Sequence, residues 1–463
     1  MVFELRASAT ISVRLPARLA NAFANYTKLA AAVALLIGGG AQQGLWSDAV
    51  VELVFLPLLA WALFKLAPHR LSRDSKWALI LLAAILLLPL VQLIPWPPAI
   101  WTSLPARDKI AAGYRAAGMA LPWLPISLDP AATARSLLSL LPAAAIFLAM
   151  LSLDNASRRA LVKLVLFIAF VSVCIGFIQI MGEQGYFYAI TNPGMAVGFF
   201  ANGNHNAAFL ACAIPYAGAR VIDVYSNRQS SPATSALTAL LLAVLVIGVA
   251  VVGSRAGLGL GFVAGLLCIA MGYRDGFGGR RGALTIALAG FLVASLIAFQ
   301  FVLAGWERRG AEDRDIVEDL RWPVATVTVQ AAQQYFPLGS GFGTFVPIYQ
   351  MSSPRSQVFE RYVNHAHDDW LEIALEGGLP ALACIAGFLA WFGRASVRAW
   401  GASVHSNGNC ARAGSAAIVL LMLHSVVDYP LRSIAIMTVF ALSCGFLIPA
   451  KNADTRTAAS NIG

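Results

Sequence analysis

Apolar runs of about 18 residues recur along this chain, and a run of that length can cross the hydrocarbon core of a bilayer. Charged residues make up only 12 % of the chain, against roughly 25 % in soluble globular proteins. We count about twelve spans, over residues 28–43, 49–67, 77–94, 136–153, 161–181, 204–224, 234–252, 256–273, 283–303, 370–392, 413–427 and 433–448. The sequence therefore predicts an all-α, polytopic membrane protein.

Lysine and arginine occur in every second connection between these spans, which is typical of cytoplasmic loops. Lys76 follows the second span, Arg228 the sixth and Arg398 the tenth, whereas the loops 43–48 and 182–203 carry no basic residue. The N-terminus has neither the apolar core nor the cleavage site of a signal peptide, and we expect both termini in the cytoplasm. The net charge of +10 is then a topology signal, and a nucleic-acid partner is not expected.

This orientation predicts five parts and places the loop between spans 9 and 10 on the periplasmic side. The parts are a cytoplasmic tail over 1–26, the first nine spans over 27–303 with an outer loop at 95–135, a large periplasmic loop over 304–368, the last three spans over 369–450 and a cytoplasmic tail over 451–463.

Within the large loop, residues 316–335 have apolar side chains at helical spacing, which predicts an amphipathic helix on the membrane surface. Three glycines then follow: Gly339, Gly341 and Gly343. They could form a phosphate loop, but no strand of a βαβ unit precedes them. A tight turn or a close backbone approach is the favoured interpretation.

The stretch 363–380 concentrates charge where the next span begins. If Asp368 or Asp369 opens a helix, Asp369, Glu372 and Glu376 share one face through their i, i+3, i+7 spacing. Ionisable side chains inside a span are rare and usually face a cavity or a partner. This acidic face (Asp369, Glu372 and Glu376) is therefore a functional-site signal.

Other polar residues map to the same outer level. They are Asn202, Asn204, His205, Arg255, Arg321, His365, His367, His424 and Asp428. A buried Arg255 would need an anion, either Glu372, Glu376 or a ligand phosphate. Structural alternatives stay open: His205 and the asparagines could cap a span, His424 and Asp428 could form a hydrogen-bonded pair, and Arg255 could be structural.

The outer face of a membrane has no nucleotide supply, so a transferase there needs a membrane-bound donor that is already activated. A glycan on a polyprenyl diphosphate is such a donor, and two guanidinium groups could stabilise its leaving group. A neutral imidazole could take the proton of the attacking hydroxyl. A metal scheme is weaker because Asp368 and Asp369 are the single adjacent acidic pair in the proposed site, and the six cysteines show no metal-binding spacing.

Several segments in order carry a resemblance to a known family. They are FFANGNHNAAFL (199–210), GSRAGLG (253–259), Arg321 followed by FPLGSGFGTF (336–345), HDDWLEIALEGGLP (367–380) and LHSVVDYPLR (423–432). Together they resemble the O-antigen ligase and polymerase family of bacterial inner membranes, over roughly residue 123 to the last span. A histidine that opens a span eleven positions before a glycine, here His367 and Gly378, is the most telling feature.

The resemblance implies a metal-independent glycosyltransferase without a cofactor. Such an enzyme moves a glycan from undecaprenyl diphosphate to a glycan or lipid A-core acceptor, at a site facing the periplasm and among membrane lipid. By matching motifs, His367 would activate the acceptor, and Arg255 and Arg321 would hold the diphosphate. Substrate binding is expected of Asn202, Asn204, His205, His365, Asp368, Glu372, Glu376, His424 and Asp428. Asp368 departs from the asparagine that many members have there.

Two other classes of protein have to be weighed. A lipid-linked glycan flippase should show duplicated halves and broken spans that face each other at the midplane. The sequence shows no such repeat, and its polar groups gather at one face. A non-catalytic assembly subunit would not need a cluster of histidines and arginines. The enzyme is the favoured interpretation.

The topology is directly testable. Reporter fusions after Ser230 and Arg398 should read cytoplasmic, and fusions within residues 311–361 should read periplasmic, because the basic loops fix the orientation. A cytoplasmic reading from the large loop would remove the argument for a site without nucleotides.

Overall fold

The computed structural model describes residues 17–42, 44–66, 71–182, 184–226, 230–274, 315–354, 363–401 and 408–450. The span predicted over residues 283–303 lies outside these residues. Within them the chain is almost entirely helical, as the sequence predicts, and nine helices are long and apolar enough to cross a membrane. The polytopic all-α class is confirmed.

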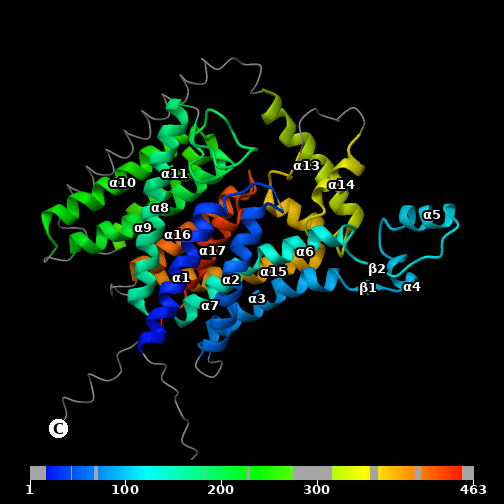
Figure 1. Cartoon of the computed structure of the whole chain (residues 1–463), viewed down its shortest axis with the longest axis horizontal. Helices are drawn as coiled ribbons and strands as arrows, with labels where there is room; N and C mark the ends of the chain where they lie inside the picture. Colours follow the sequence, from blue (N-terminus) through cyan, green and yellow to red (C-terminus); the bar gives the residue numbers. More distant parts are fainter. Residues whose placement is uncertain are drawn as a thin grey trace, which may run out of the picture.

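Figure 1 shows the helices of the bundle. They are α1 (Ala17–Ile37), α2 (Trp46–Lys65), α3 (Arg73–Gln92), α6 (Pro130–Ser139) continued by α7 (Leu141–Ser152), α8 (Asn155–Gly182), α9 (Gly203–Ser226), α10 (Pro232–Val252), α11 (Arg255–Arg274), α15 (Asp369–Gly401), α16 (Gly408–His424) and α17 (Ile434–Phe446). The predicted spans 413–427 and 433–448 correspond to α16 and α17, which are the shorter apolar helices of the set.

The first helix ends earlier than the predicted span 28–43. Three successive glycines begin at Gly38, and glycine is the residue that most readily leaves helical geometry. The carbonyl of Gly38 instead accepts hydrogen bonds from Ala435 N at 2.9 Å and Ser433 Oγ at 3.1 Å. The glycines therefore join the end of α1 to the start of α17.

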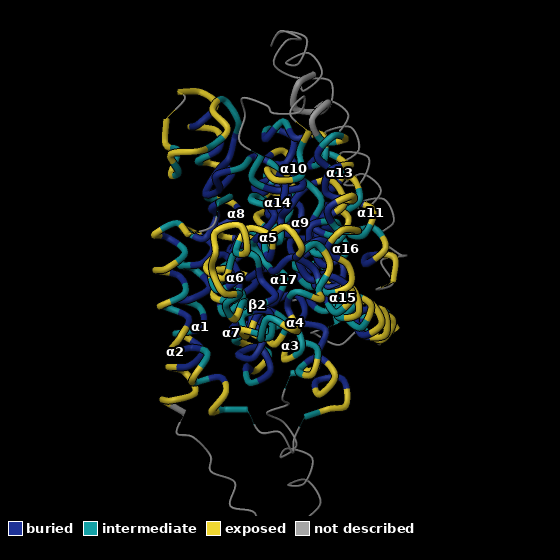
Figure 2. Tube along the Cα trace, turned by 90° about the vertical axis from the view of Figure 1, so that its right-hand side faces the viewer, coloured by how far each residue is buried: buried dark blue, intermediate teal, exposed yellow. Residues whose placement is uncertain are grey.

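Burial separates a central layer from a lipid-facing one. In α9, 83 % of the most apolar 18-residue stretch is buried, whereas in α3 the buried share of the corresponding stretch is 22 %. Large apolar side chains such as Leu53, Phe64, Ile80 and Leu87 are exposed on α2 and α3. Buried residues fill the middle of the molecule and exposed ones follow its outer edges (Figure 2). An exposed apolar belt of this kind suits contact with lipid.

The outer loop at 95–135 projects from the bundle in Figure 1. It contains β1 (Pro95–Trp96), α4 (Pro98–Trp101), α5 (Asp108–Ala116) and β2 (Leu124–Pro125), with β1 antiparallel to β2. The C-terminal end of this loop contacts the glycine-rich part of the large loop. Leu128 N donates to Ser340 O at 2.9 Å, and Thr133 Oγ1 donates to Phe342 O at 2.7 Å.

The predicted helix over 316–335 is present as α13 (Asp315–Tyr335), and α14 (Phe345–Ser352) follows it. Side chains of α13 at helical spacing are buried in a second, smaller core of the protein, where the sequence predicted a membrane surface. This core contains Val324, Val327, Ala331, Tyr335, Phe345, Ile348, Tyr349, Ala366 and Leu375. It joins α13 and α14 to the first turns of α15.

The glycine run at 339–343 forms a close backbone approach, which confirms that interpretation. Gly339, Gly341 and Gly343 all have positive φ, and a Cβ on Gly339 would lie 2.4 Å from the carbonyl oxygen of Glu376. On the other side of this contact Gly378 interrupts α15 with φ of 56° and ψ of −149°. A Cβ there would lie 2.1 Å from Pro337 O, so both sides of the contact require glycine.

Candidate functional site

Three of the four histidines predicted at the outer level come together around Tyr429, and the fourth lies near the adjacent Asp428. Ring centroids of His205, His365 and His367 lie 5.0, 4.3 and 5.0 Å from that of Tyr429. His424 lies at the end of α16, with Nε2 3.7 Å from Oδ2 of Asp428. The cluster therefore unites the start of α9, the segment before α15, and the connection from α16 to η5 (Pro430–Arg432).

His367 is the accessible member of the cluster. Its side chain is 27 % exposed, and Nδ1 lies 3.3 Å from Oδ1 of the fully buried Asp428. Burial would raise the pKa of the Asp428 carboxyl, but the hydrogen bond with His367 and the charges of nearby histidines hold it well below its usual range. An ionised carboxylate can only accept, so Nδ1 must be the donor. Nε2 then keeps its lone pair, as a general base requires.

The other three histidines are buried. His365 Nδ1 lies 2.9 Å from Glu372 Oε1, so this ring contacts a buried carboxylate. Both ring nitrogens of His205 and of His424 lack a hydrogen-bond partner among the described residues. His205 and His365 pack against Tyr429, and His424 lies near Asp428. Contact of these histidines with substrate stays a prediction.

The predicted asparagines support Tyr429 and α9. Asn202 Oδ1 accepts the backbone N–H of Asn204 at 2.9 Å at the start of α9, which fits the capping alternative. Asn202 Nδ2 also donates to the Tyr429 hydroxyl at 3.4 Å. Asn364, which the sequence reasoning did not select, donates to the same hydroxyl at 3.2 Å.

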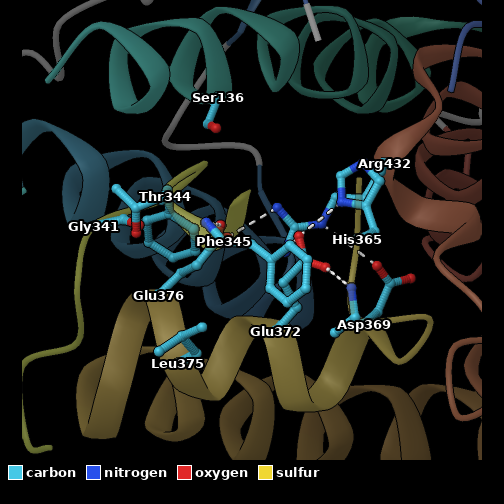
Figure 3. A network of polar contacts seen from close by, with 12 residues as sticks. Ser136, Gly341, Thr344, Phe345, His365, Asp369, Glu372, Leu375, Glu376 and Arg432 are labelled. Carbon is cyan, nitrogen blue, oxygen red and sulfur yellow. Dashed lines mark hydrogen bonds and ion pairs between the residues drawn. The ribbon is translucent and has the colours of Figure 1, made fainter. Parts of the chain in front are cut away.

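The acidic face of α15 surrounds one arginine, Arg432 at the end of η5. Its nitrogens lie 3.5 Å from Asp369, 3.3 Å from Glu372 and 3.0 Å from Glu376. Figure 3 shows the three carboxylate residues along α15 with Arg432 and His365 on one side of the helix. Burial would lower the pKa of Arg432, but the three carboxylates outweigh it and raise that pKa. The guanidinium therefore remains charged.

This pairing corrects two expectations. The sequence reasoning gave Arg255 an anionic partner, either Glu372, Glu376 or a ligand phosphate, and expected both glutamates to bind substrate. Glu372 and Glu376 are instead 1 % and 0 % exposed and pair with Arg432. Arg255 is an exposed residue at the start of α11. Asp368 is the N-cap of α15, because its Oδ1 accepts the N–H of Leu371 at 3.0 Å.

Arg321 lies closer to the histidines. It is partly buried in α13, within electrostatic range of His424. Its Nε is buried and has no hydrogen-bond partner among the described residues. A bound anion would satisfy a guanidinium nitrogen of this kind.

An apolar cavity of about 570 Å³ lies among α2, α3, α7, α15 and α17. Leu82, Phe147 and Ile385 contribute to its apolar wall. Asp369 and Arg432 also line it. The cavity therefore connects a space suited to hydrocarbon with the charged network under the histidines.

Residues 239–386 match the family model described as O-antigen ligase. This match supports the resemblance to the O-antigen ligase and polymerase family. A comparison with curated proteins finds no match. The match agrees with the multi-pass membrane architecture of the bundle.

The family match ends before part of the site. It includes Arg255, Arg321 and His367, whereas Asp428 and Arg432 lie beyond it. Sequence reasoning assigned no role to Arg432 or Tyr429, although both occur in the segment LHSVVDYPLR. One signal could have found Arg432: three carboxylates on one face of a membrane helix need a buried cation.

Asp428→Asn tests the His367 geometry. The amide can donate as well as accept, so it no longer selects the Nδ1–H tautomer of His367. The rate of glycan transfer by purified protein should fall by about 10²- to 10⁴-fold, the range seen when a histidine is misplaced or loses its orienting carboxylate.

Asp368→Asn is the matched control, because asparagine caps a helix about as well as aspartate. It should transfer at close to the wild-type rate. Wild-type transfer by Asp428→Asn would show that this carboxylate does not orient a reacting histidine.

Proposed function

We propose that this protein is a membrane glycosyltransferase that moves a glycan from a polyprenyl-diphosphate donor to an acceptor hydroxyl. The observation that carries the proposal is the partly exposed His367, held by an ionised, buried Asp428 with Nε2 left as acceptor. The match to the O-antigen ligase model supports a lipid-linked glycan as donor. The acceptor is a second lipid-linked glycan in a polymerase or the lipid A core in a ligase.

In the proposed step, Nε2 of His367 removes the proton from the acceptor hydroxyl while its oxygen attacks the anomeric carbon of the donor. The bond between that carbon and the diphosphate oxygen breaks, and polyprenyl diphosphate leaves with the bonding electrons. Asp428 stabilises the imidazolium that forms. The proton later passes from His367 to solvent or to the leaving diphosphate, which restores the base.

The leaving diphosphate gains negative charge as the bond breaks, and we assign Arg321 and Arg255 to stabilise it. Arginine offers a planar fork of donors that matches phosphate oxygens, which lysine does not. The position of Arg321 beside His424 supports its assignment. The assignment of Arg255 rests on its motif in the family resemblance.

The apolar cavity supports a lipid-linked substrate. A hydrocarbon chain can pass from the lipid into an apolar cavity without contact with water, although transfer between two apolar surroundings has little hydrophobic driving force. We assign the cavity to the polyprenyl chain of the donor. With the large outer loop facing the periplasm, the reaction would take place on the periplasmic face of the bacterial inner membrane.

Substitution of His367 separates catalysis from architecture. His367→Ala should lower the transfer rate by about 10²- to 10⁴-fold, the usual contribution of general acid–base catalysis. Donor binding should survive, because the diphosphate is assigned to the arginines. Transfer from a purified polyprenyl-diphosphate glycan, measured beside donor binding, is the assay.

Two controls accompany this measurement. His365→Ala should be much milder, because His365 is buried against Glu372 and Tyr429. EDTA should leave the wild-type rate unchanged, since the proposed step involves no metal. Near-wild-type transfer by His367→Ala would exclude this histidine as the base.

A further inference from the structure

His367 occupies a backbone conformation that must be held by its surroundings. Its φ is +53°, in the left-handed region that side chains other than glycine rarely adopt. The residue lies in the histidine turn (His365, Ala366 and His367), directly before the N-cap of α15. Neighbouring groups must therefore compensate for the strained backbone of the turn.

Glu372 contacts this turn from α15 with both of its carboxylate oxygens. Oε2 accepts the backbone N–H of Ala366 at 2.8 Å, and Oε1 accepts from Nδ1 of His365 at 2.9 Å. Ala366 is the residue immediately before His367, so this hydrogen bond acts one peptide away from the strained φ. The carboxylate is 1 % exposed and does not touch solvent-borne substrate.

Arg432 holds Glu372 in place, because Nη2 of Arg432 lies 3.3 Å from Oε1 of Glu372. The same short segment carries Asp428, which contacts the imidazole of His367. Asp369 ties the segment to α15, because Oδ2 accepts Leu431 N at 3.2 Å and Ser425 Oγ at 2.8 Å. The histidine turn is thus held on its backbone by Glu372 and on its side chain by Asp428.

We propose that Glu372, fixed by Arg432, is a positioning residue that sets the orientation of His367 through the backbone of the histidine turn. The inference rests on the proposed role of His367 as base. It differs from a general structural role, since Glu376 is an equally buried carboxylate of the same network. Glu376 contacts Arg432 at 3.0 Å and Phe345 N at 3.1 Å.

The experiment compares three variants with nearly unchanged volume. Glu372→Gln keeps the shape but cannot accept from both Ala366 and His365. Glu372→Asp keeps the charge that Arg432 requires but loses the reach to the turn. Both should lower kcat by on the order of 10- to 10²-fold, the effect of a small misplacement of a reacting group, with an unchanged KM for donor. Glu376→Gln should stay close to wild type.

A double-mutant cycle supplies the decisive comparison. In a His367→Ala background, Glu372→Gln should cause no further loss, because a positioning residue acts only through the group that it positions. Equal losses in Glu372→Gln and Glu376→Gln would overturn the proposal. So would a wild-type kcat in Glu372→Asp, or a further loss in the double variant.

A labelling measurement makes the test independent of transfer activity. Modification of His367 by diethyl pyrocarbonate, followed by mass spectrometry, should be faster in both Glu372 variants than in wild type or Glu376→Gln. Unchanged labelling would contradict the inference. Wild-type transfer by His367→Ala combined with faster labelling would instead contradict the proposed function and leave the positioning contact intact.

Discussion

The buried ion pairs between Arg432 and three carboxylates are the interaction on which the outer end of the bundle depends. A carboxylate without a partner is very costly to bury, and removal of one member of a buried pair typically costs about 3–5 kcal/mol. Asp369, Glu372 and Glu376 lie on one face of α15, and Arg432 lies in η5 between α16 and α17. This network therefore fixes the relative position of the last three helices where they meet the outer loops.

The same network connects the charged interior to the exposed histidine. Glu376 accepts the backbone N–H of Phe345 and so ties in the glycine-rich loop, while Glu372 ties in the histidine turn. Four residues after Asp428, the chain delivers Arg432 to this network. A single short segment thus carries both Asp428, which contacts His367, and Arg432, which holds the histidine turn through Glu372. This connectivity therefore couples the position of His367 to that of the Arg432 network.

Much of this arrangement could be predicted from residues alone, and the rest could not. Span length and helical spacing identified the bundle and α13, and the outer-level grouping selected the three histidines at Tyr429 and His424 beside Asp428. Arg432, the partner of the acidic face, was missed, because an ion pair between distant segments depends on how helices pack. The cavity and the interruption at Gly378 also arise from packing, since each requires knowledge of which backbone lies opposite.

The central claim is that His367 and its supporting network cleave the glycosyl–diphosphate bond, and reconstitution tests it most directly. Purified protein in liposomes would be given a lipid-linked glycan and an acceptor, with glycan transfer and free polyprenyl diphosphate measured together. We expect one polyprenyl diphosphate to be released for each glycan transferred, and both signals to be lost in His367→Ala. Movement of the intact lipid-linked glycan across the bilayer without release of polyprenyl diphosphate would contradict the claim and indicate a transporter.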